Sequence, residues 1–277
     1  MRWKRHLANL PLVGPLLLFA YRARASAATG LGPLREYARW LVASRELTNY
    51  TYDLTERNKR HLAWFVSEVA GIAPAAALGY IQELENDEDL RAHIRSAIQS
   101  SPDGRFSDRE IRFGRRLGWY AIARATKPGV VVETGVDKGL GSCVLAAALR
   151  RNAEEGRPGI YYGTDIDPKA GFLFGGEYAK VGKLLYGDSV ESLLRLDAGI
   201  GLFINDSDHS VDYEAREYAV IESKLAGSAI VLGDNAHATD ELLRFAERSG
   251  RRFLYFREQP DRHWYPGAGI GAAYFGH

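Results

Sequence analysis

Short apolar segments alternate with longer helical segments over the C-terminal part of the chain. Apolar runs of this length between turn signals are typical of buried strands, and we expect seven, at 130–133, 160–164, 183–186, 199–204, 228–232, 252–256 and 269–275. Helices fill most of the gaps, which predicts a mostly parallel sheet wrapped by helices. A loop rather than a helix separates the last two segments, so we expect the final strand to run antiparallel.

The earlier part of the chain has a helical pattern. Between about Leu34 and Ser100, apolar residues are spaced to form one helix face, as at Leu62, Phe65 and Val66. The polar and aromatic stretch 49–58 is interpreted as a capped loop between helices, with substrate contact as the alternative.

Turn-forming residues at 100–108 mark the best candidate boundary. We therefore expect a helical N-terminal extension at 1–105, acting as a cap, in dimerisation or in membrane-surface contact, and an α/β domain at 106–277. A helix from about 108 to 125 should lead into the sheet.

An apolar run at 10–21 is flanked by basic residues on both sides. Pro11, Gly14 and Pro15 interrupt it, and a membrane span needs roughly 20 apolar residues. We therefore expect neither secretion nor a span, and a cytoplasmic protein. Three alternatives remain for this segment: docking on the domain, docking on a second subunit in a homodimer, or peripheral contact with a membrane surface.

Length and composition limit the class of partner. The 277 residues are 46% hydrophobic, enough for one good-sized α/β domain with an appendage. The 36 basic and 35 acidic residues nearly cancel, so no global field recruits nucleic acid, and we expect a small-molecule partner. The only cysteine, Cys143, excludes an intramolecular disulfide and a cysteine-rich zinc site, and we interpret it as a buried residue at a helix start.

The segment VVETGVDKGLGS, at 131–142, places three glycines where a strand turns into a helix. Gly135, Gly139 and Gly141 allow positive φ and a close approach of a ligand to the main chain. A tight turn that binds nothing is the alternative. Glu133 lies inside the turn, where its charge would repel a phosphate, so a cationic cofactor without phosphates fits better than a dinucleotide.

This turn resembles motif I of the class I S-adenosylmethionine-dependent methyltransferases. The resemblance implies a Rossmann-like, doubly wound, seven-stranded fold over roughly 108–277, with cofactor contacts at Glu133, Gly135, Gly139, Gly141 and Ser142. It also implies that Glu133 orders the loop and the methionine end of S-adenosylmethionine.

Acids recur where later strands end, which is where ligands bind in open α/β sheets. Asp165 is placed to accept hydrogen bonds from both ribose hydroxyls. Asp188 is placed to accept from the adenine amino group and Ser189 to offer its backbone amide, although Asp188 is equally suited to cap the next helix. These positions match motifs II and III of the same family.

The fourth and fifth strands end in FINDSDHS and VLGDNAH. Asp206, Asp234 and Asn235 would offer three oxygen ligands from adjacent strand ends, the chemistry that Mg²⁺ or another divalent cation favours. The three residues resemble the ligand pattern of catechol O-methyltransferase and related metal-dependent O-methyltransferases. His209 stands where those enzymes carry a lysine base, and the DxDH pattern is most similar to the macrocin O-methyltransferase and cephalosporin-biosynthesis group.

These features predict a divalent-metal-dependent O-methyltransferase acting on a hydroxylated small molecule, such as a sugar or a natural-product precursor. Asp206 and His209 are the expected catalytic residues, with His209 as the proton acceptor. The alternatives are a nicotinamide-dependent oxidoreductase and a catalytically idle cofactor-binding scaffold. His263 and Trp264, ahead of the last strand, are candidates for a wall of the substrate pocket.

Overall fold

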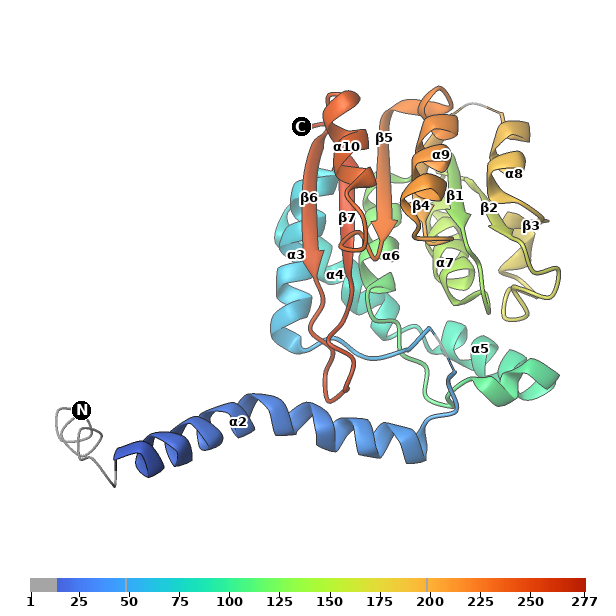
Figure 1. The fold of residues 1–277 in the computed structure, drawn as a ribbon. Helices are drawn as coiled ribbons and strands as arrows, with labels where there is room; N and C mark the ends of the chain where they lie inside the picture. Colours follow the sequence, from blue (N-terminus) through green and yellow to red (C-terminus); the bar gives the residue numbers. More distant parts are fainter. Residues whose placement is uncertain (1–13, 48, 198) are drawn as a thin grey trace. The chain divides into compact units, whose positions relative to one another are not determined.

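The computed structural model describes residues 14–47, 49–197 and 199–277 (Figure 1). These residues fall into two compact units, one made of 14–44 with 262–266 and the other of 45–261 with 267–277. The larger unit thus begins ahead of the expected boundary at 100–108. In the smaller unit, Trp264 packs against Tyr37 and Trp40 of helix α2 (Gly14–Ala43), with ring centroids 5.3 Å apart in both pairs.

The larger unit is built on a seven-stranded sheet in the order β3-β2-β1-β4-β5-β7-β6. Its strands are β1 (Val130–Thr134), β2 (Ile160–Asp165), β3 (Gly182–Tyr186), β4 (Ile200–Asn205), β5 (Leu225–Asp234), β6 (Arg252–Arg257) and β7 (Gly269–Tyr274). The first five run parallel, and β7 lies antiparallel between β5 and β6. The predicted Rossmann-like α/β class and the antiparallel last strand are confirmed.

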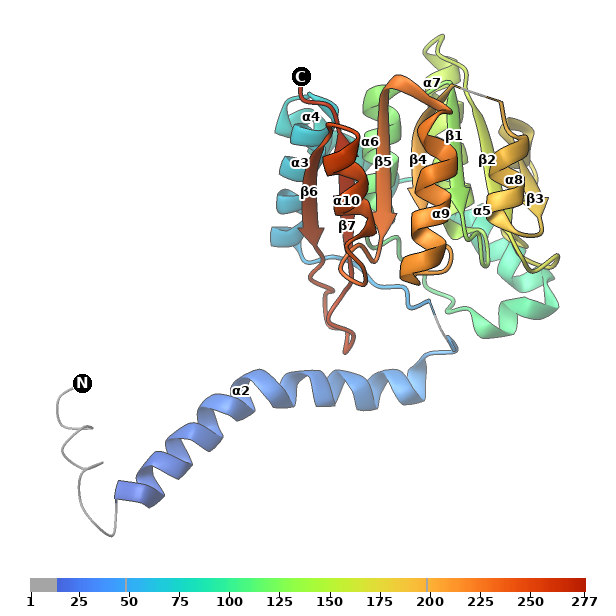
Figure 2. The ribbon, with the colours of Figure 1, turned by 45° about the horizontal axis from the view of Figure 1, so that its top comes forward.

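Helices cover both faces of this sheet (Figure 2). One face carries α3 (Glu56–Ala70), α4 (Pro74–Glu85), α6 (Arg116–Thr126) and α7 (Leu140–Glu154), and the other carries α8 (Ser189–Arg195), α9 (Val211–Glu222) and α10 (Glu241–Arg248). Helix α5 (Glu88–Ser100) packs on α7 and leads into a short 3₁₀ turn, η1 (Pro102–Phe106). The predicted helical pattern ahead of the sheet is confirmed.

The apolar core explains why the sheet forms. Fully buried Phe203 and Val231 lie on the central strands, and Tyr218 and Phe245 reach the same cluster from α9 and α10. Each large apolar side chain removed from water stabilises the fold by roughly 2 kcal/mol. The strand segments are therefore held in place by burial, and their carboxyl ends form one edge of the parallel sheet.

One predicted helix begins later than expected. Residues 108–115 form a loop, and α6 starts at Arg116 rather than near Asp108. Gly114 takes a left-handed φ of 51°, which a continuous right-handed helix excludes, and the loop buries Ile111 and Phe113 instead. The irregular segment sets the direction of Arg115 at the start of α6.

The stretch 49–58 contains the cap of α3 that its sequence predicts, and its last three residues begin that helix. Thr55 caps α3 by accepting a hydrogen bond from the Asn58 amide (3.2 Å). Asn58 in turn accepts from the Gln259 amide (2.8 Å) and donates to the Arg257 carbonyl (3.0 Å). The loop is therefore tied to the end of β6.

Among the helices of the described part of the chain, none by itself is long and apolar enough to cross a membrane. The bent pair α3 and α4 meets that criterion by length and composition only, and both helices bury apolar side chains in the larger unit.

Candidate functional site

The turn between β1 and α7 lies at the point where the order of the strands in the sheet reverses. From β1 it proceeds to β2 and β3 on one side, and from β4 to β5 on the other. Gly135, with φ of 81°, lies at this switch point, and a Cβ there would be 2.0 Å from the Asp206 carbonyl oxygen. Open α/β sheets bind ligands at such a point, and only glycine permits this close approach of the β1 and β4 exits.

Glu133 lies behind the turn rather than facing open space. Its buried carboxylate accepts hydrogen bonds from Ser142 (3.2 Å) and from Tyr161 of β2. A Cβ at Gly141 would be 2.0 Å from Oε1 of Glu133, so the glycine makes room for the acid. Burial raises the pKa of Glu133 from 4.5 to about 7. These contacts connect the end of β1 to the start of α7 and to β2.

A cavity of about 640 Å³ opens beyond the carboxyl ends of β1, β2, β3 and β4. Its wall includes four of the predicted cofactor residues: Gly135, Asp165, Asp188 and Ser189. The other four lie outside the wall: Glu133, Gly139, Gly141 and Ser142. The cavity is therefore lined by the strand ends, with the glycine-rich helix start behind them.

Asp165 is held at the end of β2 by backbone amides. Its two carboxylate oxygens accept from the amides of Asp137 and Asp167, both at 2.8 Å. A carboxylate oxygen has more than one lone pair, so each can still accept from a hydroxyl group in the cavity. Asp165 is thus pre-positioned for a diol such as a ribose.

Asp188 caps α8, as predicted, and also lines the cavity. Its Oδ1 accepts from the Glu191 amide (3.0 Å), and its Oδ2 accepts from the hydroxyl of Tyr213 (3.1 Å). The Ser189 amide also donates to this hydroxyl, at 3.3 Å. Tyr213 is a cavity residue that the sequence analysis missed.

Glu217 of α9 joins the ends of three strands. It accepts from Thr134 at the end of β1 (3.1 Å), from Ser207 after β4 (2.9 Å), and from Ser189 and Asn205. Glu217 is buried, and four hydrogen bonds from neutral donors satisfy its carboxylate. Glu217 therefore holds the strand ends that line the cavity in fixed positions.

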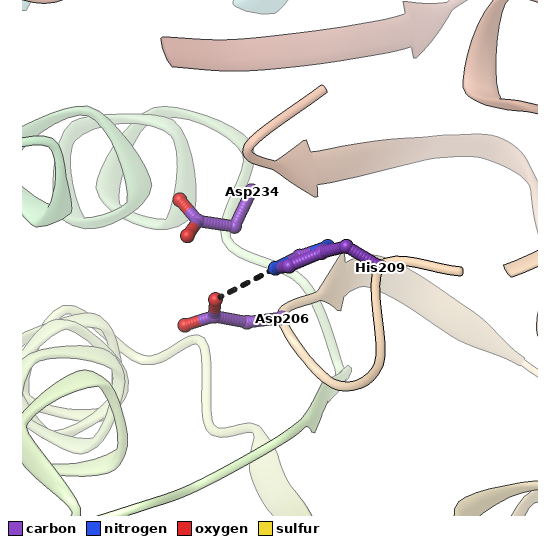
Figure 3. A group of neighbouring side chains, drawn as sticks. All are labelled: Asp206, His209 and Asp234. Atoms are coloured by element: carbon purple, nitrogen blue, oxygen red, sulfur yellow. Dashed lines mark ion pairs between the residues drawn. The ribbon is translucent and has the colours of Figure 1, made fainter. Parts of the chain in front are cut away.

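Asp206, His209 and Asp234 come together at the ends of β4 and β5 (Figure 3). One ligand atom from each lies within 4.8 Å of the others. Nε2 of His209 is 3.8 Å from Oδ1 of Asp206. The predicted ligand Asn235 is adjacent, but its amide group donates to Asp234 and to His209, both at 3.1 Å. His209 thus joins Asp206 and Asp234, with Asn235 beside the three residues.

Hydrogen bonds on both ring nitrogens fix the orientation of His209. Nδ1 lies 3.1 Å from the buried carboxylate of Glu214 and must donate to it, because a carboxylate only accepts. Nε2 lies 3.1 Å from the side-chain nitrogen of Asn235. Asp206 and Asp208 line the cavity, whereas His209 lies outside its wall.

Arg115 is the cation of this cluster, and the sequence analysis missed it. The buried guanidinium faces both carboxylate oxygens of Asp234 and lies 4.0 Å from Asp206. Burial alone would raise the pKa of Asp234, but the Arg115 charge lowers it below its ordinary value. Burial and the Asp234 charge raise the pKa of Asp206 well above its usual range. The positive charge of one arginine therefore does not compensate the negative charges of both Asp234 and Asp206.

The cluster fits a divalent cation by its chemistry. Two carboxylates and an imidazole converge, and with one arginine they carry a formal net charge of −1 when both acids are ionised. Carboxylate oxygens suit a hard cation such as Mg²⁺ or Mn²⁺, and the imidazole suits a divalent transition metal such as Fe²⁺ or Zn²⁺. Asp206, His209 and Asp234 are the residues that would hold it, in place of the contacts that Asp234 makes with Arg115 and that His209 makes with Asn235.

Arg116 faces the cavity next to this cluster. Its side chain lines the wall, and its buried Nε has no hydrogen-bond partner among the described residues. The guanidinium lies over the Trp119 ring, 5.4 Å from its centroid. Most other charged groups on the wall are aspartates, so Arg116 offers a place for an anionic group.

Cys143 is buried at the start of α7, as predicted, and its thiol contacts the Leu173 carbonyl oxygen at 3.2 Å. Burial raises the pKa of this thiol. A thiol of this kind packs as a small apolar side chain.

The chain matches one protein-family model, described as a methyltransferase domain, over residues 132–236. This span runs from β1 through β5 and includes the glycine turn, Asp165, Asp188 and the acid cluster. No curated protein sequence gives a significant match to the chain.

Solved structures of methyltransferases share this fold. The O-methyltransferase TomG from Streptomyces achromogenes, involved in tomaymycin synthesis and solved with S-adenosylmethionine, is 15% identical at a TM-score of 0.51, over 67% of this chain and 90% of that one. A putative O-methyltransferase from Klebsiella pneumoniae is 15% identical at 0.52, over 71% and 94%. An O-methyltransferase from Bacillus cereus, solved with S-adenosylhomocysteine, is 12% identical at 0.50, over 66% and 90%.

The family match covers the strand ends that form the cavity, and the fold agrees with it across the sheet. Residues 132–236 therefore form a methyltransferase domain with a Rossmann-like fold.

Proposed function

We propose that this methyltransferase transfers the methyl group of S-adenosylmethionine to a hydroxyl oxygen of a small molecule, with sugars and natural-product precursors as the substrate class. One observation carries the proposal: a single cavity is lined at one end by Asp165 and Asp188 and at the other by Asp206 and Asp208. The first pair suits a nucleoside, and the second suits the hydroxyl of an acceptor. The O-methyltransferase fold neighbours support the same reaction type.

The polar groups of the wall define how the cofactor lies. Asp165 would accept hydrogen bonds from the ribose hydroxyls and Asp188 from the adenine amino group of a bound cofactor. Arg116, on the same part of the wall, would bind the carboxylate of the methionine part. The acidic surroundings suit the positive sulfonium and amino groups.

The acceptor hydroxyl must lose a proton as its oxygen attacks the methyl carbon. Asp208 lines the cavity and takes a hydrogen bond from the Ser210 amide (2.9 Å), which holds its carboxylate in place. We assign it as the proton acceptor. His209, which was the expected base, lies outside the wall and contacts Glu214 and Asn235, so we assign it to the support of the acid cluster.

We further propose that Mg²⁺ or another divalent cation binds at Asp206, His209 and Asp234. When bound, such an ion acidifies a hydroxyl group and helps to orient it. Arg115 keeps Asp234 ionised, and the uncompensated Asp206 faces the cavity. Asn235 supports both Asp234 and His209 by donating hydrogen bonds.

Two titrations and one turnover screen test this function. Isothermal titration should show S-adenosylhomocysteine binding and no tight binding of NAD; the reverse would favour a nicotinamide-dependent oxidoreductase. A screen with labelled S-adenosylmethionine and Mg²⁺ across sugars, glycolipid headgroups and phenols should yield a labelled methyl ether. Cofactor binding without transfer to any acceptor would favour an idle scaffold.

A further inference from the structure

The first turns of α2 expose apolar side chains that its own compact unit does not cover. Leu16 and Phe19 are 70% and 71% exposed, and Leu17, Leu18 and Tyr21 are also exposed. Successive residues of a helix are rotated by about 100°, so the four consecutive residues 16–19 present apolar surface on all sides.

The charge around this segment has one sign. Residues 1–35 contain six lysines and arginines and no acidic residue, which leaves 30 basic against 35 acidic residues in the rest of the chain. Arg22 and Arg24 are exposed directly after the apolar turns, and neither forms an ion pair within the described ranges. Their positive charge complements an anionic surface.

Two other roles for this segment fit these observations less well. A second copy of the chain would bring two acid-free basic segments together, and their like charges would repel. Helix α2 has 30 residues, but no part of it within the described residues is apolar enough to cross a membrane. Short apolar helix turns followed by arginines suit shallow insertion, with the apolar side chains in the acyl region and the arginines at the headgroups.

We propose that the first turns of α2, together with the basic residues around them, dock the protein on an anionic phospholipid surface. The inference is independent of the reaction at the sheet, because it rests on residues of the smaller unit and on the charge of its sequence. It selects membrane contact among the three alternatives that the apolar run at 10–21 leaves open.

Co-sedimentation of the full chain with phospholipid vesicles tests the proposal. The protein should sediment with vesicles of equal parts phosphatidylglycerol and phosphatidylcholine in about 0.1 M salt, and much less in about 1 M salt, where charges are screened. Pure phosphatidylcholine vesicles should retain little of it. Each basic residue near an anionic surface adds a similar amount of binding free energy. The loss of two of them in R22Q/R24Q should therefore weaken vesicle binding roughly 30-fold.

Two further variants separate the apolar and the charged contributions. L16S/F19S should abolish vesicle binding even at low salt, while R60Q/R109Q, which removes two exposed arginines of the larger unit, should bind like the wild type. Far-UV circular dichroism and the melting temperature should match the wild type for all three. The proposal would be overturned if the wild type failed to bind anionic vesicles, or if R22Q/R24Q bound them as well as the wild type does. It would also be overturned if the wild type formed a dimer that L16S/F19S dissociates and showed no vesicle binding.

Discussion

Arg115, at the start of α6, faces both carboxylate oxygens of Asp234 at the end of β5, 119 residues later in the sequence. Both side chains are buried, so each depends on the other for compensation of its charge. The pair connects the start of α6 to the end of β5, where Asp234 joins Asp206 and His209. It also brings Arg116, the next residue, to the cavity wall.

Replacing Arg115 should destabilise the protein strongly. In R115M the buried Asp234 loses its partner, and an uncompensated buried charge typically costs about 3–5 kcal/mol of unfolding free energy. Urea denaturation measures this loss. The double variant R115M/D234N should regain most of it, because it removes both charges. An R115M protein as stable as the wild type would show that the pair is not coupled.

Arg116 should distinguish ligands that carry the methionine part from those that lack it. Loss of one charge-assisted hydrogen bond typically costs about 1.5–3 kcal/mol, so R116Q should bind S-adenosylhomocysteine roughly 10- to 100-fold more weakly. Methylthioadenosine has no amino acid part and should bind both proteins equally in isothermal titration. K169Q, which alters another cation of the wall, should not separate the two ligands. Equal losses for both ligands in R116Q would refute the assignment.

Asp208 and His209 should differ in their effect on turnover. A positioned general base typically contributes about 10²- to 10⁴-fold, so D208N should lower kcat by that factor while the affinity for S-adenosylhomocysteine stays the same. H209N should retain a base-limited pH profile like that of the wild type, with a weaker response to Mg²⁺. If H209N instead abolishes turnover and D208N does not, then His209 is the base, as its sequence position first indicated.

Glu133 should make stability fall as pH rises. Its pKa is raised by burial from 4.5 to about 7, so the folded state binds this proton more tightly than the unfolded state does. The resulting stabilisation is complete below pH 4.5 and is lost as pH rises through 7, by up to about 3 kcal/mol. The difference in unfolding free energy between pH 5 and pH 8 should shrink in E133Q and stay unchanged in the exposed control E222Q. An unchanged difference in E133Q would exclude Glu133 as the source.

The sheet could be predicted from the sequence because local pattern and burial agree. All seven strands lie within a few residues of their expected positions. Short apolar runs between turn signals are typical of buried strands, so the local pattern indicates them. The start of α6 could not be predicted in this way. Residues 108–115 have helix-compatible composition, but Gly114 and the burial of Ile111 and Phe113 favour a loop.

The candidate site was predictable only in part. Gly135, Asp165 and Asp188 follow strands directly, so their place at the cavity follows from topology. Arg115 lies far from Asp234 in sequence, and no local signal marks a tertiary ion pair. Which of Asp208 and His209 faces the cavity depends on loop geometry and on Glu214, five residues after His209.

Methyl transfer with and without a chelator tests the central claim most directly. The full chain, labelled S-adenosylmethionine and a hydroxylated acceptor from the screen should give a labelled methyl ether in the presence of Mg²⁺. Excess EDTA should abolish the product, and added Mg²⁺ should restore it. Full activity in excess EDTA would contradict the proposed cation at Asp206, His209 and Asp234, and transfer to nitrogen or carbon with none to oxygen would contradict the proposed reaction.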